Sequence, residues 1–230
     1  MMALYVIGDL HLSFGTNKPM DIFGEVWVNH YEKIKEDWIS RVTESDTVIL
    51  PGDSSWAMTF NAATDDLKWI DELPGRKILF KGNHDYWWVS KAKMAGCYSN
   101  IEFVHNAFAI YEDMAICGTR GWLCPNEVVF TENDDKVYKR EALRLENSIL
   151  MAKKAGYERI VGVLHFPPTN DKKEPSRFTE IFEKYGVKEV VYGHIHSKQN
   201  YKYGIKGLYG GVNYHLTSCD YLDFKLFEWF

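Results

Sequence analysis

Five short apolar runs divide the chain, and each of them ends in a group of polar residues. A short apolar run bounded by polar residues, Gly or Pro is typical of a buried strand. Functional side chains in open α/β sheets gather beyond the carboxyl ends of the strands, so we expect these polar groups to lie together. The runs with their polar continuations are Ala3–Ile7 with Gly8-Asp9-Leu10-His11, Thr47–Leu50 with Pro51-Gly52-Asp53, Lys77–Phe80 with Gly82-Asn83-His84-Asp85, Arg159–Leu164 with His165-Phe166-Pro167-Pro168, and Glu189–Tyr192 with Gly193-His194-Ile195-His196.

Segments with helical spacing lie between several of these runs. Apolar residues recur there at steps of three and four positions, which is typical of an amphipathic helix. Asp134 and Asp135 precede the longest of these segments, so we expect them to cap its N-terminus and to interact favourably with its dipole. The predicted helices are 31–42, 67–73 and a long helix over 138–155, whose apolar positions are Leu143, Leu145, Ile149, Leu150 and Ala152.

Three further stretches, 102–111, 114–117 and 201–230, have a different pattern. They are rich in Tyr, Phe, Val and Ile with Gly interruptions, which predicts antiparallel strands. Strands that alternate with helices, together with these added strands, predict an α/β fold of mixed α+β character with two mixed β-sheets flanked by helices. No repeat or linker divides the chain, so we expect a single domain over residues 1–230.

Composition and charge exclude several classes of protein. Hydrophobic residues make up 46% and charged residues 26% of the chain, as in ordinary globular proteins. The formal net charge of -5 provides no overall attraction to nucleic acid or to an acidic membrane. The four cysteines form no C-x-x-C pair, which argues against a zinc knuckle or a dithiol redox site. Because no apolar run is long enough to cross a bilayer and no secretory signal is present, we expect a soluble, reduced, cytoplasmic protein.

The polar residues after the five runs form a set of potential metal ligands. They offer carboxylate oxygens, imidazole nitrogens and one amide carbonyl without a thiolate, and such a set suits Mn, Fe or Zn better than Cu(I) or an iron–sulfur cluster. One tetrahedral ion needs only four ligands, so two ions that share a carboxylate account for the number of candidates. The candidates are Asp9, His11, Asp53, Asn83, His84, Asp85, His165, His194 and His196.

These motifs resemble those of the calcineurin-like metallophosphoesterases. That family is recognised by D-x-H, G-D, G-N-H-[DE], a lone H and G-H-x-H in this order. All five motifs occur here in the same order, from the first predicted strand to the C-terminal part of the chain. The resemblance implies a four-layer αββα sandwich, in which the two sheets lie between helical layers.

The resemblance also implies roles for the site residues. His84 would face the phosphate as proton donor or charge stabiliser, and Asp85 would orient its ring. The implied reaction is hydrolysis of a phosphomonoester or phosphodiester by a metal-bound hydroxide. Manganese is the expected metal, with iron or zinc as alternatives. The implied ligands are Asp9, His11 and His196 for one ion, Asn83, His165 and His194 for the other, and Asp53 as the bridge.

Other residues near these motifs have two open interpretations. Asn83 is also a candidate for contact with the substrate, and Arg120 could reach its phosphate or form a structural ion pair. Trp56 stands where family members often have an acidic residue, and it either packs or lines the substrate mouth. The polar segment 170–174 is either a lid or an ordinary surface loop.

Three functions remain open at this point. The first is a hydrolase whose partner is a small-molecule phosphate ester. The second is a metal-binding scaffold of the same fold without turnover, against which the presence of His84 and of all the ligand positions argues. The third is a nuclease of the same fold, against which the acidic balance and the lack of a basic stripe argue.

Overall fold

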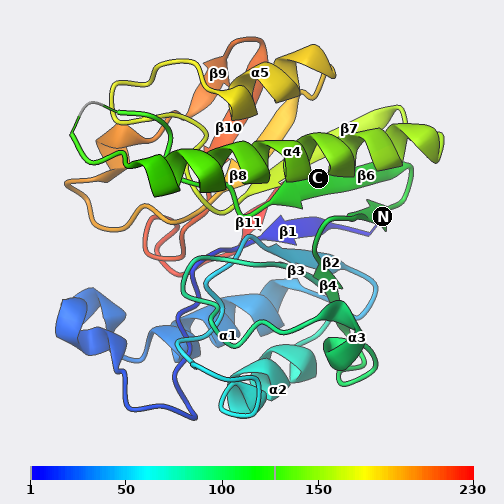
Figure 1. Ribbon diagram of the computed structural model, residues 1–230. Coiled ribbons are helices and arrows are strands. Elements are labelled where there is room, and N and C mark those ends of the chain that lie inside the picture. Colours follow the sequence, from blue (N-terminus) through cyan, green and yellow to red (C-terminus); the bar gives the residue numbers. More distant parts are fainter. Residues whose placement is uncertain (1, 127) are drawn as a thin grey trace. The chain divides into compact units, whose positions relative to one another are not determined.

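The chain forms two compact units, each with its own β-sheet. A computed structural model describes residues 2–126 and 128–230. The first unit extends to Phe103 and includes Thr217–Phe230, and the second unit is Val104–Leu216. Each sheet contains parallel and antiparallel strand pairs and carries helices (Figure 1). The predicted mixed α/β fold with two mixed sheets flanked by helices is therefore confirmed.

The sheet of the first unit places three of the predicted polar loops at one edge. Its strand order is β11-β1-β2-β3-β4. The first three strands in sequence run parallel, with Tyr5 opposite Val48 and Val48 opposite Lys77. Their carboxyl ends consequently lie side by side, as predicted. The strands are β1 (Leu4–Val6), β2 (Thr47–Leu50), β3 (Arg76–Phe80), β4 (Ile101–Val104) and β11 (Phe227–Glu228).

The helices of the first unit cover one face of this sheet (Figure 1). Ile34 and Trp38 of one helix and Leu67 and Ile70 of another are fully buried in a single core with strand residues such as Leu50. This arrangement confirms the predicted helices 31–42 and 67–73. The helices are α1 (His30–Arg41), α2 (Thr64–Glu72) and α3 (Lys91–Met94), and the short 3-10 segments are Met20–Phe23 and Glu25–Trp27.

A buried lysine at the start of β3 makes the stability of the first unit depend on pH. Lys77 is fully buried, and its ammonium donates to the carbonyls of Leu73, Gly75 and Asp71. Burial lowers its pKa to about 8, although the charge of Asp71 acts in the opposite direction. Between this value and the ordinary value of 10.5, the unfolded chain binds a proton that the folded chain does not, so stability rises with pH.

We therefore expect the wild-type protein to gain stability relative to Lys77→Met as the pH rises from about 8 to 10. The gain has an upper limit of roughly 3 kcal/mol, because one pKa unit corresponds to about 1.4 kcal/mol. Urea denaturation of both proteins at the two pH values measures this difference. The exposed Lys68→Met variant on α2 is the control. Equal differences at both pH values would contradict the expectation.

The sheet of the second unit holds the other two predicted loops. Its order is β5-β6-β7-β8-β10-β9. The strands β6, β7 and β8 run parallel, so the residues after β7 and β8 lie at the same edge. The strands are β5 (Phe108–Tyr111), β6 (Met114–Thr119), β7 (Arg159–Leu164), β8 (Glu189–Tyr192), β9 (Gly207–Tyr209) and β10 (Val212–Leu216).

The prediction of antiparallel strands in 102–111, 114–117 and 201–230 is only partly right. β5 pairs antiparallel with β6, and β9 pairs antiparallel with β10. However, β10 runs parallel to β8 and β6 runs parallel to β7. The stretch 201–230 also contains a 3-10 segment at Tyr201–Tyr203 and contributes β11 to the first unit. The residue composition of a strand predicts extended backbone, but the direction of its partner depends on long-range topology.

The long helix α4 (Glu132–Lys154) begins earlier than predicted, and its cap is a different residue. The N-cap is Thr131, whose hydroxyl accepts the backbone N–H of Asp134, while the Asp134 carboxylate accepts the backbone N–H of Thr131 at 2.9 Å. This reciprocal pair is a capping box. Asp134 and Asp135 therefore lie in the first helical turn, where their charge still complements the helix dipole.

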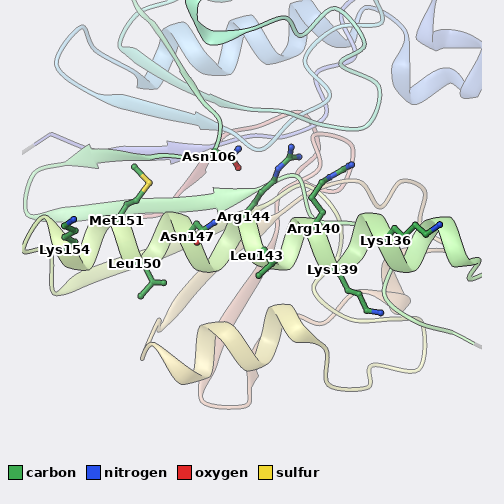
Figure 2. A pocket seen from close by; sticks show the side chains of 10 residues that line it. All are labelled: Asn106, Lys136, Lys139, Arg140, Leu143, Arg144, Asn147, Leu150, Met151 and Lys154. Carbon is green, nitrogen blue, oxygen red and sulfur yellow. The ribbon is translucent and has the colours of Figure 1, made fainter.

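Two leucines of α4 that were predicted as part of its apolar face point to solvent. Leu143 is 60% and Leu150 is 44% exposed, whereas Leu145, Ile149 and Ala152 are buried. Figure 2 shows Leu143 and Leu150 among the Lys and Arg side chains that follow one another along the helix. The residues there line an open groove of about 760 Å³. Among the described residues, its lining consists of Asn106 and residues of α4, and it includes no predicted site residue.

A second helix of this unit, α5 (Arg177–Lys184), was not predicted. Ser176 caps it by accepting the N–H groups of Phe178 and Thr179. Phe178, Ile181 and Phe182 enter the core that α4 also covers. Among the helices that the structure describes, none is both long and apolar enough to cross a membrane.

Candidate metal centre

The loops after β1 and β2 run side by side and carry three of the predicted metal ligands. The backbone N–H of Asp9 donates to the carbonyl of Gly52 at 3.0 Å, and that of His11 donates to the carbonyl of Asp53 at 2.9 Å. A parallel bridge between Leu12 and Ser55 continues this pairing. Both loops are therefore fixed by backbone hydrogen bonds, and the ligand side chains do not depend on flexible segments.

Each of these three candidate ligands has a left-handed backbone conformation. The φ angles of Asp9, His11 and Asp53 are 60°, 46° and 53°, and all three residues are buried. Such a conformation is unfavourable for residues other than glycine, and it persists where the surrounding structure enforces it, often at functional sites. The backbone strain at these three positions supports a role beyond packing.

The loop after β3 is held by Asp85. Its fully buried carboxylate accepts backbone N–H groups of Asp53, Ser54 and Gly82 at 2.7–2.9 Å and of Ser55 at 3.3 Å. It also accepts the indole N–H of Trp87 at 2.9 Å. Asp85 thus ties the β2 and β3 loops together. The role of Asp85 in orienting the His84 ring stays a prediction.

A glycine at the start of this loop permits a close approach of the two loops. A Cβ atom on Gly82 would overlap with the carboxylate and the backbone nitrogen of Asp53. Any larger residue would displace Asp53 from its position. The glycine of the predicted Gly-Asn-His-Asp motif therefore has a steric reason in this structure.

Asp53 lies close to two of the predicted histidines. Its Oδ1 accepts the backbone N–H of His84 at 2.8 Å, and its Oδ2 lies 3.9 Å from Nε2 of His11. The rings of His11 and His84 have centroids 5.9 Å apart. Asn83, directly before His84, is half-buried. The first unit thus brings the ring of His11 and the backbone of His84 to one buried carboxylate.

Trp56, for which packing and lining of the substrate mouth were both open, belongs to this cluster. Its ring stacks on His11 at 4.7 Å between centroids and lies 4.3 Å from that of His84. Its indole N–H points to the sulfur of Met20 at 3.0 Å. Trp56 therefore packs and lines the site through the same contact with His11 and His84. The signal in the sequence was its position three residues after Asp53.

Two other buried groups support the loops of the first unit. The thiol of Cys219 donates to the carbonyl of Asp9 at 3.0 Å, and burial raises its pKa well above the ordinary value. The thiol therefore serves as a hydrogen-bond donor to the backbone of the loop after β1. Asp66 accepts the hydroxyl of Ser55 and the backbone N–H of Phe14, and burial raises its pKa as well.

The second unit brings together two of its three predicted histidines. His165 follows β7 and is fully buried, and its Nε2 lies 3.3 Å from Nδ1 of His194. The carbonyl of His165 also accepts the backbone N–H of Gly193 at 3.1 Å. His194 has a φ of 72°, the same unfavourable left-handed conformation as in the first unit. His196 is half-buried, two residues further along the same loop.

Arg120 supports this loop through its backbone and has a structural ion-pair partner. Its carbonyl accepts the N–H groups of His165 and Phe166 at 3.1 and 2.9 Å. Its guanidinium lies 3.7 Å from Glu141 and over the ring of Trp122 at 4.4 Å. Of the two predicted interpretations, the structural ion pair is the one with an observed partner.

The segment 170–174 is organised by Asn170. The side-chain oxygen of Asn170 accepts the backbone N–H groups of Lys172 and Glu174, both at 3.1 Å. Its amide nitrogen donates to the carbonyl of Pro125 at 2.9 Å and to Glu174 at 2.6 Å. These bonds are those of an ordered turn, which favours the ordinary surface loop over the lid.

The donor chemistry of both units fits hard or borderline divalent cations. Carboxylates and imidazoles on fixed loops are ligands that Mn, Fe and Zn accept, and the two groups of candidate ligands among the described residues contain no cysteine. All four cysteines are free. The candidate metal ligands are Asp9, His11 and Asp53 in the first unit and His165, His194 and His196 in the second.

Comparison with solved structures shows the same fold in proteins of low sequence identity. A protein of unknown function from Aquifex aeolicus matches with a TM-score of 0.55 and 17% identity, over 98% of this chain and 95% of that chain. A protein from Thermus thermophilus matches with a TM-score of 0.55 and 12% identity, over 86% of this chain and 84% of that chain. The phosphopantetheinyl hydrolase from Mycobacterium tuberculosis matches with a TM-score of 0.50 and 15% identity, over 92% of this chain and 87% of that chain.

Comparison with curated proteins gave no match. The family model described as calcineurin-like phosphoesterase matches residues 2–198. This range contains all five motifs and both groups of candidate ligands. The chain therefore belongs to the calcineurin-like phosphoesterase family.

Proposed function

We propose that the protein is a dimetal-dependent phosphohydrolase that cleaves a small-molecule phosphomonoester or phosphodiester. The family membership supports phosphoester hydrolysis, and a phosphopantetheinyl hydrolase is among the proteins of the same fold. The observation that carries the proposal is the buried carboxylate of Asp53, which has the His11 ring at one oxygen and the backbone N–H of His84 at the other. The proposed metals are two divalent ions, manganese in the first place, with iron or zinc as alternatives.

The ligand assignment follows the motifs. We propose that Asp53 is the bridge, because its two oxygens already face different partners in the first unit. The 3.3 Å separation of the His165 and His194 nitrogens supports their joint action on one ion. The proposed ligands are Asp9, His11 and His196 for one ion and Asn83, His165 and His194 for the other.

The protein side chains then have separate tasks. When bound, the metals supply the positive charge that acidifies a water molecule and stabilises the phosphoryl oxygens. The half-buried ring of His84 can donate a proton or a hydrogen bond to the phosphate or the leaving group. Asp85 and Gly82 fix the backbone that carries this ring. We propose that Asn83, the residue directly before His84, also contacts the substrate.

The test is hydrolysis of p-nitrophenyl phosphate and of its bis ester with Mn²⁺, Fe²⁺ or Zn²⁺. We expect metal-dependent turnover of at least one ester, and a loss of about 10²–10⁴-fold in His84→Ala, as for removal of a general acid. The exposed His105, which lies outside the motifs, provides the control variant His105→Ala with wild-type activity. If no metal supports turnover of either ester, and His84→Ala behaves like the wild type, the scaffold function is favoured instead.

A further inference from the structure

A cavity of about 500 Å³ opens beside two of the candidate ligands in the second unit. His194 and His196 form part of its lining. The remainder comes from the segment after β6 and from the loops after β7 and β8. Its apolar lining residues include Trp122, Leu123, Val128, Val129, Phe166 and Ile195.

Aromatic rings connect the candidate ligand to this cavity. The ring of Phe166 lies 4.1 Å from that of His194, and the ring of Trp122 lies 5.0 Å from that of Phe166. Both aromatic residues line the cavity. A group attached to a phosphate at His194 can therefore extend directly over an aromatic surface.

The wall formed by the segment after β6 is held from several sides. The side-chain oxygen of Asn126 accepts the N–H groups of Val128 and Val129 at 3.0 and 2.9 Å. The indole of Trp122 donates to Asp134 of α4 at 3.0 Å. Val128 and Val129 are nevertheless 87% and 60% exposed. The side chains of Val128 and Val129 are thus displayed at the cavity, where a ligand could cover them.

The lining contains little charge. Among the described residues that line the cavity, none is Lys or Arg, and Asp171 is the one carboxylate. Apart from Asp171 and the two histidines, its polar side chains are uncharged, and they include the buried hydroxyl of Thr169, which has no hydrogen-bond partner among the described residues. Such a lining suits an uncharged apolar group with an occasional hydrogen-bonding atom, and it offers nothing for a second phosphate.

We propose that this cavity binds the alcohol part of the phosphoester substrate and selects uncharged, largely apolar alcohols, with ring-bearing groups preferred. The inference rests on the proposed function, because it assigns the substrate class of the same site. The aromatic pair of Trp122 and Phe166 is the reason for the preference for rings. Small polyol esters would leave the apolar wall exposed to water.

The test compares two alkyl esters, 3-phenylpropyl phosphate and glycerol 3-phosphate, whose leaving alcohols are of similar acidity. We expect kcat/KM to be at least about tenfold higher for the phenylpropyl ester, since several apolar carbons leave water. Val129→Asp is expected to lower this ratio at least about fivefold, mainly through KM, because it places a charge at the apolar wall. Leu143→Asp on α4 is the matched control, because both side chains are 60% exposed and Leu143 lies outside the cavity.

A second measurement separates the two proposals. Binding of 1-naphthol, followed by its fluorescence, requires no turnover, and we expect Val129→Asp to weaken it while Leu143→Asp does not. Equal kcat/KM for both esters, with naphthol binding unchanged in Val129→Asp, would overturn the assignment of the cavity and leave the hydrolase intact. If no ester is turned over but Val129→Asp still weakens naphthol binding, the hydrolase function would be overturned and the cavity would remain an apolar ligand site.

Discussion

Asp53→Asn is expected to lower the occupancy of both metal positions and to reduce turnover of p-nitrophenyl phosphate by at least about 100-fold. Replacing a residue that only supports a metal ligand already lowers metal affinity or activity about 10–100-fold. We propose that Asp53 is itself a shared ligand. The substitution removes the negative charge that lies 3.9 Å from Nε2 of His11. An asparagine retains an oxygen that can accept the N–H of His84, as Asp53 does at 2.8 Å, so the loop should keep its conformation.

Metal content by plasma mass spectrometry after dialysis, together with the rate, measures this result. Asp46→Asn is the matched control, because Asp46 is also buried in the first unit and accepts the N–H groups of Ala3 and Thr43 at 2.7 and 2.8 Å. It precedes β2, whereas Asp53 follows it. The control is expected to lose stability and to keep its metal. Two full metal equivalents in Asp53→Asn would refute the bridging role.

The positions of the candidate ligands were predictable because the sequence pattern and the topology agree. Apolar runs such as Thr47–Leu50 and Glu189–Tyr192 are strands with the predicted bounds. The strands are short and buried, so their carboxyl ends follow directly from where the apolar residues stop. Parallel pairing then aligns these ends at one edge in each sheet.

Other features depended on contacts that a linear pattern does not contain. The exposure of Leu143 and Leu150 follows from which side of α4 packs on β6, and steps of three and four residues occur on both sides of a long helix. The cap at Thr131 depends on a reciprocal bond with Asp134. The contact of Trp56 with His11 depends on the bridge between the β1 and β2 loops. Long-range geometry therefore limited the prediction more than residue chemistry did.

Asp85 illustrates this limit most clearly and leads to the largest expected effect on stability. From sequence it was a partner for His84, whereas in the structure its carboxylate accepts four backbone N–H groups and the indole of Trp87. Replacement by alanine would leave these buried donors without an acceptor, at a cost of about 1–3 kcal/mol for each donor that water cannot reach. We expect Asp85→Ala to lower the free energy of unfolding by more than about 4 kcal/mol, in the range that broken buried networks produce.

Asp85→Asn provides the milder variant if the alanine protein does not fold. Its amide nitrogen would face N–H groups that need an acceptor, so a loss of about 2–4 kcal/mol is expected, since hydrogen bonds to charged groups are the stronger ones. Urea denaturation followed by tryptophan fluorescence measures both variants. Asp71→Ala is the control, because Asp71 also accepts two backbone N–H groups, those of Ser99 and Asn100, but in exposed hydrogen bonds in which water can replace it. If Asp85→Asn instead keeps the wild-type stability while its turnover falls, the main role of the carboxylate is to act on the His84 ring and not to hold the two loops together.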